Sequence, residues 1–204
     1  MIGIIGTKKG MTQLFDDEGN VVPVTVIEAG PCVVTQVKTA ERDGYEAAQL
    51  AYGDCKDKSL SKAELGHLKK AGVKHGKRHL AEIRGMADVT VGDTVTVEAF
   101  AEGQSVTVSG VSKGKGFQGT IRRHGFGRGP ETHGSHNVRK PGSIGASAYP
   151  ARVFKGMRMS GHMGAGAVTQ AGLTVVGTDA ENNILLVRGP VPGARESVVI
   201  VRGR

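Results

Sequence analysis

Residues 112–163 show no hydrophobic periodicity, and this constrains the fold more than any other feature of the 204-residue chain. Eleven of these 52 residues are glycine and three are proline, and a period of neither 2 nor 3.6 persists beyond a few residues. A structureless stretch of this length is unusual inside a compact domain unless it is functional or disordered. The segment is therefore predicted to be either a disordered basic stretch or an extension that a partner orders.

Positive charge is concentrated in the same segment. The chain carries a formal charge of +8 at pH 7, but residues 112–163 alone hold ten basic side chains against one acid, Glu131, which gives +9. A second segment, residues 56–84, holds nine basic and three acidic side chains, so the rest of the chain has a net charge of −7. Basic segments set into an otherwise acidic protein indicate an anionic partner.

The residue types interspersed with these cations favour RNA as that partner. Half of the eight aromatic residues lie here, and rings stack on unpaired bases while cations neutralise phosphates and glycines let the backbone lie against a second polymer. A membrane-binding segment would instead be an amphipathic helix, which these glycines would break, so we expect no membrane contact. A solvated basic linker is the alternative. The candidate RNA-binding residues are Lys113, Lys115, Phe117, Arg122, Arg123, His124, Arg128, His133, His136, Arg139, Lys140, Tyr149, Arg152, Phe154, Lys155, Arg158 and His162.

The remainder of the chain has the pattern of a β protein. Runs rich in β-branched residues and apolar–polar alternation are separated by turn signals, with no βαβ rhythm, which predicts a small antiparallel barrel or sandwich. One helix is expected at 61–71, because Ser61 and Glu64 have capping-box spacing and Gly72 can end it. Its basic side is either a solvated face or an RNA contact. The predicted strands are 21–28, 32–39, 45–52, 93–99, 105–111, 173–178, 183–188 and 197–202.

A dinucleotide-binding pattern is present but lacks its context. Gly114, Gly116 and Gly119 match G-x-G-x-x-G after a strand-like run. We expect no helix to follow in the sequence TIRRHGFGRGP, so that no helix N-terminus would hold a pyrophosphate. A Rossmann site is therefore not predicted.

Metal and nucleophile sites are not predicted either. His133 and His136 have a spacing that metals sometimes use, but only Glu131 is near them as a further ligand. Neither Cys32 nor Cys55 has a neighbouring histidine, and no nucleophile motif is present. We expect no catalytic residues, no metal and no cofactor.

The cysteines and the start of the sequence indicate a cytoplasmic protein. Cys32 and Cys55 lie 23 residues apart and form no paired motif, which argues against a secreted disulfide scaffold. The opening apolar run is far shorter than a signal peptide or a membrane span.

Over essentially its whole length the chain resembles a known family, the bacterial form of large-ribosomal-subunit protein three, which belongs to the universal L three family. Several long blocks in the right order carry this resemblance, which makes it far more specific than any single motif. The blocks are GIIGTKKGMTQLF at 3–15, PVTVIEAGPCVVTQVKT at 23–39, DGYEAAQLAYGD at 43–54, SKGKGFQGTIRRHGF at 112–126, THGSHNVRKPGSIG at 132–145, RVFKGMRMSGHMG at 152–164 and NILLVRGPVPGA at 183–194.

The resemblance implies a closed antiparallel β-barrel of the translation-protein type, formed by residues 1–111 and 164–204, with a basic helical insertion near 56–84. Residues 112–163 would be an extended RNA-binding arm that threads through 23S ribosomal RNA toward the peptidyl transferase centre. Family members bind the RNA early in assembly and neighbour large-subunit proteins fourteen and nineteen. We expect no homo-oligomer.

The tip of the arm departs from some relatives. By analogy it lies near residues 142–152 and adds Ser143 to the candidate RNA-binding set. Some relatives carry a glutamine there that is methylated on its side-chain nitrogen, but in this chain the position falls on Ala148. That modification cannot occur here, and Tyr149 is expected to supply a stacking contact instead.

The function predicted from the sequence is that of a structural, RNA-binding constituent of the large ribosomal subunit, and not that of an enzyme. The alternative is a free-standing RNA-binding factor of ribosome assembly with the same barrel. In the favoured mechanism the barrel docks on the RNA surface, and phosphate and stacking contacts order the arm.

Overall fold

The computed structural model describes residues 1–86 and 89–203. Contacts within the chain divide it into two units. The first, which we call the body, consists of Met1–Ser112 and Ala167–Arg204; the second, which we call the arm, is Lys113–Gly166. No helix in the described part of the chain is long and apolar enough to cross a membrane.

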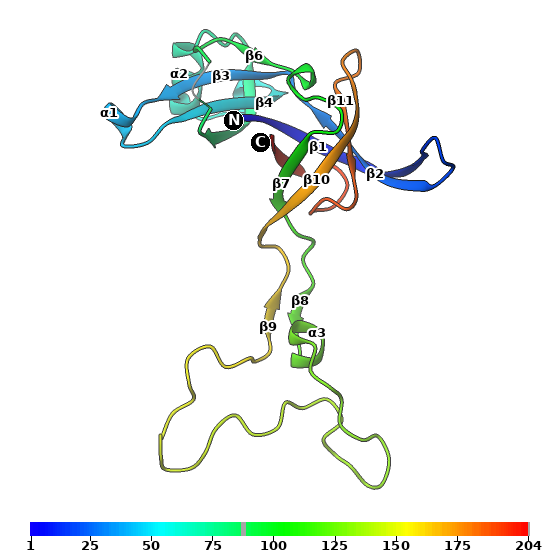
Figure 1. The fold of residues 1–204 in the computed structure, drawn as a ribbon. Coiled ribbons are helices and arrows are strands. Elements are labelled where there is room, and N and C mark those ends of the chain that lie inside the picture. The colour runs from blue at the N-terminus through cyan, green and yellow to red at the C-terminus, as the bar shows by residue number, and fades with distance from the viewer. Residues whose placement is uncertain (87–88, 204) are drawn as a thin grey trace. The chain divides into compact units, whose positions relative to one another are not determined.

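Six strands of the body form a closed antiparallel barrel, which confirms the predicted mainly β fold (Figure 1). The first strand, β1, pairs with the last one, β12, on one side and with β2 on the other. Around the barrel the strands are β1 (Ile2–Phe15), β12 (Val198–Gly203), β7 (Ser105–Val111), β10 (Ala167–Asp179), β11 (Ile184–Arg188) and β2 (Val21–Ala29).

Strand alternation builds the barrel interior. In β12, Val199 and Val201 are buried, whereas Ile200 and Arg202 between them are partly exposed. This is the period of 2 expected of a sheet with one buried face. Strands β1 and β2 lie so close at Gly6 that only glycine fits there. A Cβ atom at this position would lie 2.6 Å from the carbonyl oxygen of Glu28 on β2.

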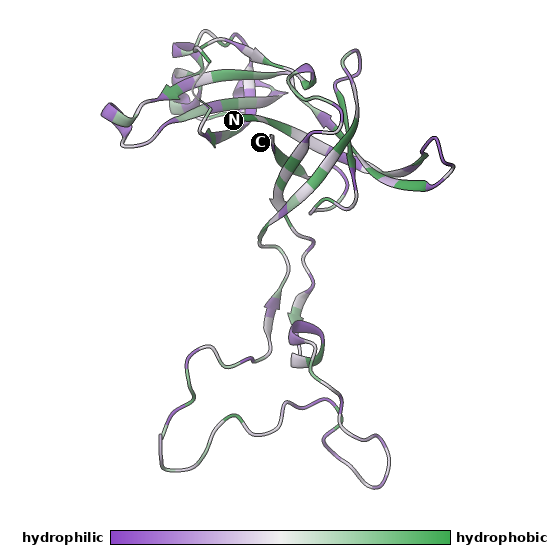
Figure 2. Ribbon diagram, in the orientation of Figure 1, coloured by the Kyte–Doolittle hydropathy of each residue, from purple (hydrophilic) through white to green (hydrophobic). Residues whose placement is uncertain are grey.

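The remaining strands of the body form a second antiparallel sheet. Its order is β5 (Gly76–Arg84), β4 (Ala47–Cys55), β3 (Cys32–Lys38) and β6 (Thr94–Val95). One apolar core joins this sheet to the barrel, since Leu50 and Ile83 of the sheet belong to the same buried cluster as Ile27, Val108 and Leu185 of the barrel. Figure 2 shows apolar residues recurring along the strands of both sheets.

Short helices connect these strands. The predicted helix is confirmed as α2 (Lys62–Lys70), whose N-cap Ser61 forms a capping box with Glu64, and Gly72 follows with a positive φ of 75°. Its residue Leu68 is buried, and His67 Nε2 lies 2.6 Å from Gln49 Oε1 on β4, so the helix is attached to the second sheet. The others are α1 (Ala40–Asp43) and the 3-10 helices η1 (Asp57–Ser59) and η2 (Val97–Ala99).

Two predictions for the body need correction. The insertion at 56–84 is helical only in its first half, because Gly76–Arg84 is strand β5. In this strand Lys77, His79, Ala81 and Ile83 lie on the less exposed face. The predicted strand at 93–99 is reduced to Thr94–Val95, since the chain turns there into η2. In addition, strand β1 was not predicted.

The arm has three short elements of its own. Strands β8 (Gly116–Gln118) and β9 (Gly161–Met163) pair with each other in an antiparallel manner. Helix α3 (Thr120–His124) follows β8 directly. The rest of the arm is irregular.

Candidate nucleic-acid interface

The arm has a hydrogen-bonded base formed by residues from its two ends. The β8–β9 pairing aligns Phe117 with His162, and the Lys115 amide donates to the Met163 carbonyl at 2.9 Å. Next to it, Gly164 has a φ of +75° and its missing Cβ leaves room for the Lys113 carbonyl, so a larger residue would collide with the backbone. The base therefore needs glycine where its two strands meet.

Helix α3 completes this base and corrects the expectation that no helix follows Gly119. The helix has only five residues and ends at Gly125, whose φ is +72°. Arg123 Nη1 and His124 Nε2 both donate to the Met159 carbonyl at 2.8 Å, which ties the helix to the returning chain. A five-residue helix of little more than one turn gives the G-x-G-x-x-G pattern no support as a dinucleotide site.

Met159, which anchors α3, was not among the predicted site residues. Met159 acts through its backbone carbonyl, which accepts both hydrogen bonds. Every residue has such a carbonyl, so no side-chain pattern could have indicated it. The signal available was the pair Arg123 and His124, two strong donors, in a segment that contains one carboxylate.

Between His124 and Met159, the contacts of the described residues are local. The Gly129 amide donates to the Val138 carbonyl at 2.9 Å, and Ser143 Oγ donates to the Gly145 carbonyl at 2.8 Å. Contacts of this kind shape small turns but join no distant parts of the loop. Many backbone amides and carbonyls there consequently face solvent or a partner.

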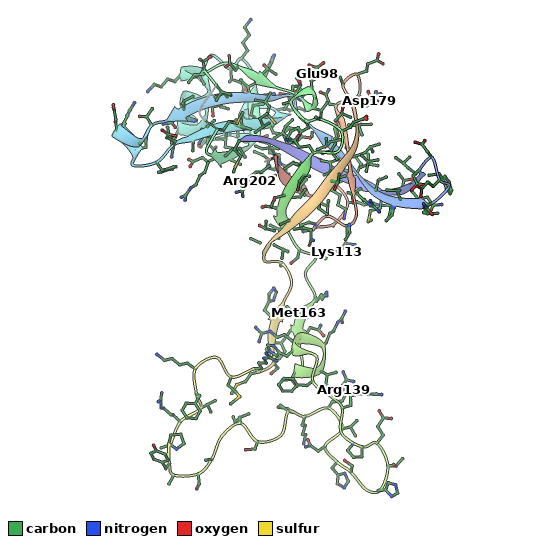
Figure 3. The ribbon with its side chains drawn as sticks, in the orientation of Figure 1. Glu98, Lys113, Arg139, Met163, Asp179 and Arg202 are labelled. Carbon is green, nitrogen blue, oxygen red and sulfur yellow. The ribbon has the colours of Figure 1, made fainter. Side chains whose placement is uncertain are left out.

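The candidate RNA-binding side chains are exposed. Of the eighteen predicted residues, His124 is half-buried because it is bound at the arm base, and the other seventeen are exposed. Figure 3 shows arm side chains standing singly along the chain between Lys113 and Met163. The seventeen exposed residues are Lys113, Lys115, Phe117, Arg122, Arg123, Arg128, His133, His136, Arg139, Lys140, Ser143, Tyr149, Arg152, Phe154, Lys155, Arg158 and His162.

The positive charge of the arm is almost uncompensated. Glu131 is its only acid, and its carboxylate lies 2.7 Å from Arg128 Nη1. Among the described residues this is the one salt bridge within the arm. The other nine basic side chains thus have no carboxylate of the arm to neutralise them, and a polyanion would meet them in an exposed state.

Three aromatic rings of the arm are also exposed. Tyr149 is 90% exposed, Phe117 75% and Phe154 56%. The Arg152 guanidinium lies 5.5 Å from the centre of the Phe154 ring, which is a cation–π distance. Exposed rings next to cations have the two functional groups that bind an unpaired nucleotide, one for the base and one for the phosphate.

The arm histidines do not form a metal-binding cluster. His133 adopts a positive φ of 57°, and His136 lies beyond the turn that follows it. In the described ranges, no group of three or more histidine, cysteine, aspartate or glutamate side chains is arranged to hold a metal ion.

The second basic segment differs from the arm because it is folded onto the body. Lys77 Nζ lies 2.7 Å from the Asp54 carboxylate, and α2 is fixed through His67 and Leu68. Part of its charge is therefore used within the protein. For its exposed lysines the two alternatives given above, a solvated face and an RNA contact, both stand.

Comparison with known proteins is consistent with these features. The sequence profile of the family described as Ribosomal protein L3 matches residues 50–180. The chain is also similar to the Large ribosomal subunit protein uL3 of Leptospira biflexa serovar Patoc, with 50% identity over 200 residues. That alignment covers 98% of this chain and 97% of the relative.

Proposed function

Because the chain belongs to the ribosomal protein L3 family, we propose that its arm binds 23S ribosomal RNA and fastens separate RNA segments together within the large subunit. Members of this family are structural components of the large ribosomal subunit and not enzymes. In this proposal, the eighteen candidate side chains within 112–163 bind the RNA. Residues 1–111 and 164–204 dock on the RNA surface.

The observation that carries this proposal is the exposed charge of the arm. Ten basic side chains face a single carboxylate there, and seventeen of the eighteen candidate residues are exposed. Like charges without counter-ions repel one another, and RNA phosphates relieve that repulsion while releasing bound cations to the solvent. The same contacts offset the entropy lost when the irregular loop becomes ordered.

The finer features of the proposal concern place and time. The arm would bind early in assembly and reach toward the peptidyl transferase centre, with its tip near residues 142–152. Proteins fourteen and nineteen of the large subunit would be its neighbours. The alternative, a free-standing assembly factor, is not favoured, because the similarity extends over the full length of a ribosomal protein.

Salt dependence of RNA binding tests the proposal. If about six basic side chains meet phosphates, the logarithm of affinity falls with the logarithm of salt concentration with a slope of about −4 to −5. Arg139→Gln should make this slope less steep by about 0.7 to 0.9, whereas Arg42→Gln, an exposed cation of the body, should leave it unchanged. Filter binding to 23S RNA measures both; an affinity that hardly changes with salt would rule the proposal out.

A substitution of Tyr149 tests whether its ring stacks on an RNA base. Its ring is 90% exposed, so Tyr149→Ala removes a base-stacking surface without opening a core. We expect abnormal large-subunit profiles in sucrose gradients and altered sensitivity to drugs that act at the catalytic centre. Tyr45→Ala in the body serves as the comparison, and a normal profile with normal drug sensitivity for Tyr149→Ala would exclude the stacking role.

A further inference from the structure

The outer half of the β1–β2 hairpin has no strand beside it. The described pairing of β1 with β12 ends at Thr7, and that of β2 with β11 ends at Val24. Beyond these points, Gln13–Phe15 pair with Val21–Pro23 and with no other strand, although the Pro23 carbonyl still accepts a hydrogen bond from the Gly189 amide at 2.9 Å. In Figure 1 this two-stranded ribbon, in blue, extends beyond the barrel. Isolated two-stranded ribbons are only marginally stable in water, so a protein that keeps one exposed needs another reason for it.

One face of the hairpin carries most of its exposed apolar side chains. The register places Phe15 opposite Val21 and Gln13 opposite Pro23, so Met11, Phe15, Val21 and Pro23 share a face with the polar Gln13. Phe15 is 68% exposed, Val21 54% and Met11 48%. Among the described aromatic residues of the body, Phe15 alone is exposed. Apolar side chains gathered on one exposed face mark an interaction surface.

The turn at the end of the ribbon is held in one conformation. Asp16 Oδ1 accepts hydrogen bonds from the amides of Glu18 at 3.1 Å and Asn20 at 2.7 Å, and the Asp16 amide donates to the Asn20 carbonyl. These bonds to the charged carboxylate hold the pKa of Asp16 below its ordinary value. The surface is therefore formed before any partner binds, which reduces the ordering cost of binding.

The charge of the ribbon identifies the class of partner. Residues 10–27 contain three acids, Asp16, Asp17 and Glu18, and no lysine or arginine, although the whole chain carries +8. The cations that border this stretch lie toward the barrel: Lys9 precedes it on β1, Arg188 lies opposite Val24 on β11, and Arg195 Nε lies 3.9 Å from where a Cβ atom of residue 10 would be. Phosphates would be repelled by such a tip, whereas lysine and arginine side chains would be attracted.

We propose that residues 10–23 form a docking surface for a basic protein of the large subunit, with an apolar patch that covers Met11, Phe15 and Val21 and with lysines or arginines that meet Asp17 and Glu18. This inference rests on the proposed function only in placing the chain within the large subunit. It does not depend on how the arm binds RNA.

Site-specific photo-crosslinking tests this docking surface. A benzoylphenylalanine residue replaces Phe15 in the full chain, supplied as the only cellular copy, and large subunits are irradiated after a high-salt wash. We expect a ribonuclease-resistant cross-link to another protein, at a peptide that contains lysine or arginine. A cross-link to RNA, a cross-link to a second copy of this chain, or no cross-link would overturn the inference.

The same probe at Tyr149 separates the two proposals. A cross-link from Tyr149 to RNA supports the proposed function whatever the probe at Phe15 gives. If the chain is absent from washed subunits, or the probe at Tyr149 reaches no RNA, the proposed function fails instead.

A charge reversal at Asp17 tests whether the acidic tip attracts the partner. Asp17→Lys, combined with the probe at Phe15, should reduce the protein cross-link about fivefold or more, because a repulsive contact replaces an attractive one. Glu181→Lys makes the same charge change at an exposed position in the turn between β10 and β11, and should leave the yield unchanged. Equal yields from both variants would refute the assigned role of the acidic tip.

Discussion

The body and the arm solve the problem of backbone polar groups in different ways. In the body, ladders of two sheets satisfy them, and one apolar core fixes how the strands pack. In the arm, the only buried side chain among the described residues is that of Thr120, and outside the base the hydrogen bonds are local. The body is thus stabilised by its own interior, whereas the arm presents unsatisfied backbone and charge to the outside.

The difference shows what glycine does in each unit. In the body, Gly6 lets two barrel strands approach closely. In the arm, Gly164 admits a backbone carbonyl at the base, and other glycines reduce the side-chain bulk between cations. The same residue type therefore serves packing in one unit and access in the other.

Removing the arm tests the comparison most strongly. Ala167 pairs with Val111 across the β7–β10 ladder, so a short Gly-Ser linker can replace Lys113–Gly166. We expect affinity for 23S RNA to fall sharply and its log–log dependence on salt to become shallower by about 4 to 5, because some six phosphate contacts disappear. The midpoint of thermal unfolding should stay nearly the same, since the body keeps its core. A body that unfolds without the arm would contradict the comparison.

Matched isoleucine truncations give the next largest effect. Ile27→Ala in the barrel core should lower the free energy of unfolding by about 2 to 5 kcal/mol, because it leaves a cavity among fully buried neighbours. Ile144→Ala in the arm, where the side chain is 40% exposed, should change it by less than about 0.5 kcal/mol. Urea unfolding monitored by circular dichroism measures both, and similar losses would show that the arm has a core of its own.

The base of the arm should behave differently from its loop. Trypsin is expected to cleave the free protein after Arg139, Arg152 or Arg158 faster than after Arg123, which lies within α3. His124→Ala removes one of the two bonds to the Met159 carbonyl and should speed cleavage after Arg123 about fivefold to tenfold, as loss of about 1 kcal/mol predicts.

His136→Ala, in the loop, is the control for that experiment and should not change cleavage after Arg123. If the wild-type arm is cut equally fast at Arg123 and Arg139, the base does not form without RNA.

Acid should affect the body through its turns, and this is the smallest effect expected. Hydrogen bonds from backbone amides of their turns lower the pKa values of Asp16 and Asp93 from the ordinary 3.8, and the side-chain amide of Asn182, helped by its backbone amide, lowers that of Asp179. A carboxyl whose native pKa is depressed adds stability above its unfolded pKa, and that stability is lost as pH falls through the native pKa.

The urea midpoint of the body should therefore be constant from pH 7 to about 5 and fall below about 4. In Asp93→Asn, the acceptor of the Thr90 amide becomes a neutral amide oxygen and the charge is lost, so the midpoint at pH 7 should be lower and its fall on acidification shallower. A steeper fall would mean that Asp93 does not contribute in this way.

Where the sequence had a clear period, the fold could be predicted. Alternation at 183–188 and 197–202 corresponds to β11 and β12, and the capping box of Ser61 and Glu64 begins α2. These signals are local, so each strand or helix could be recognised without its neighbours.

The elements that were missed depend on distant partners. Strand β1 has three glycines and two adjacent lysines, and it is a strand because β12 and β2 pair with both its edges. Burial alternates along strand β5, but its less exposed face includes Lys77 and His79. Because these side chains are polar, the sequence shows no apolar–polar alternation there. The exposure of the candidate residues suits RNA binding, which itself stays a prediction, since no sequence pattern specifies which nucleotide each residue meets.

Closure of the barrel has a consequence for the order of events during synthesis. Strand β12 is translated after every other strand and fills the place between β1 and β7, so the barrel cannot close until Gly203 has left the exit tunnel. The arm is translated before β10, β11 and β12. Residues 113–166, the segment proposed to bind RNA, are consequently available to a partner while the barrel is still open, before the unit that carries them has finished folding.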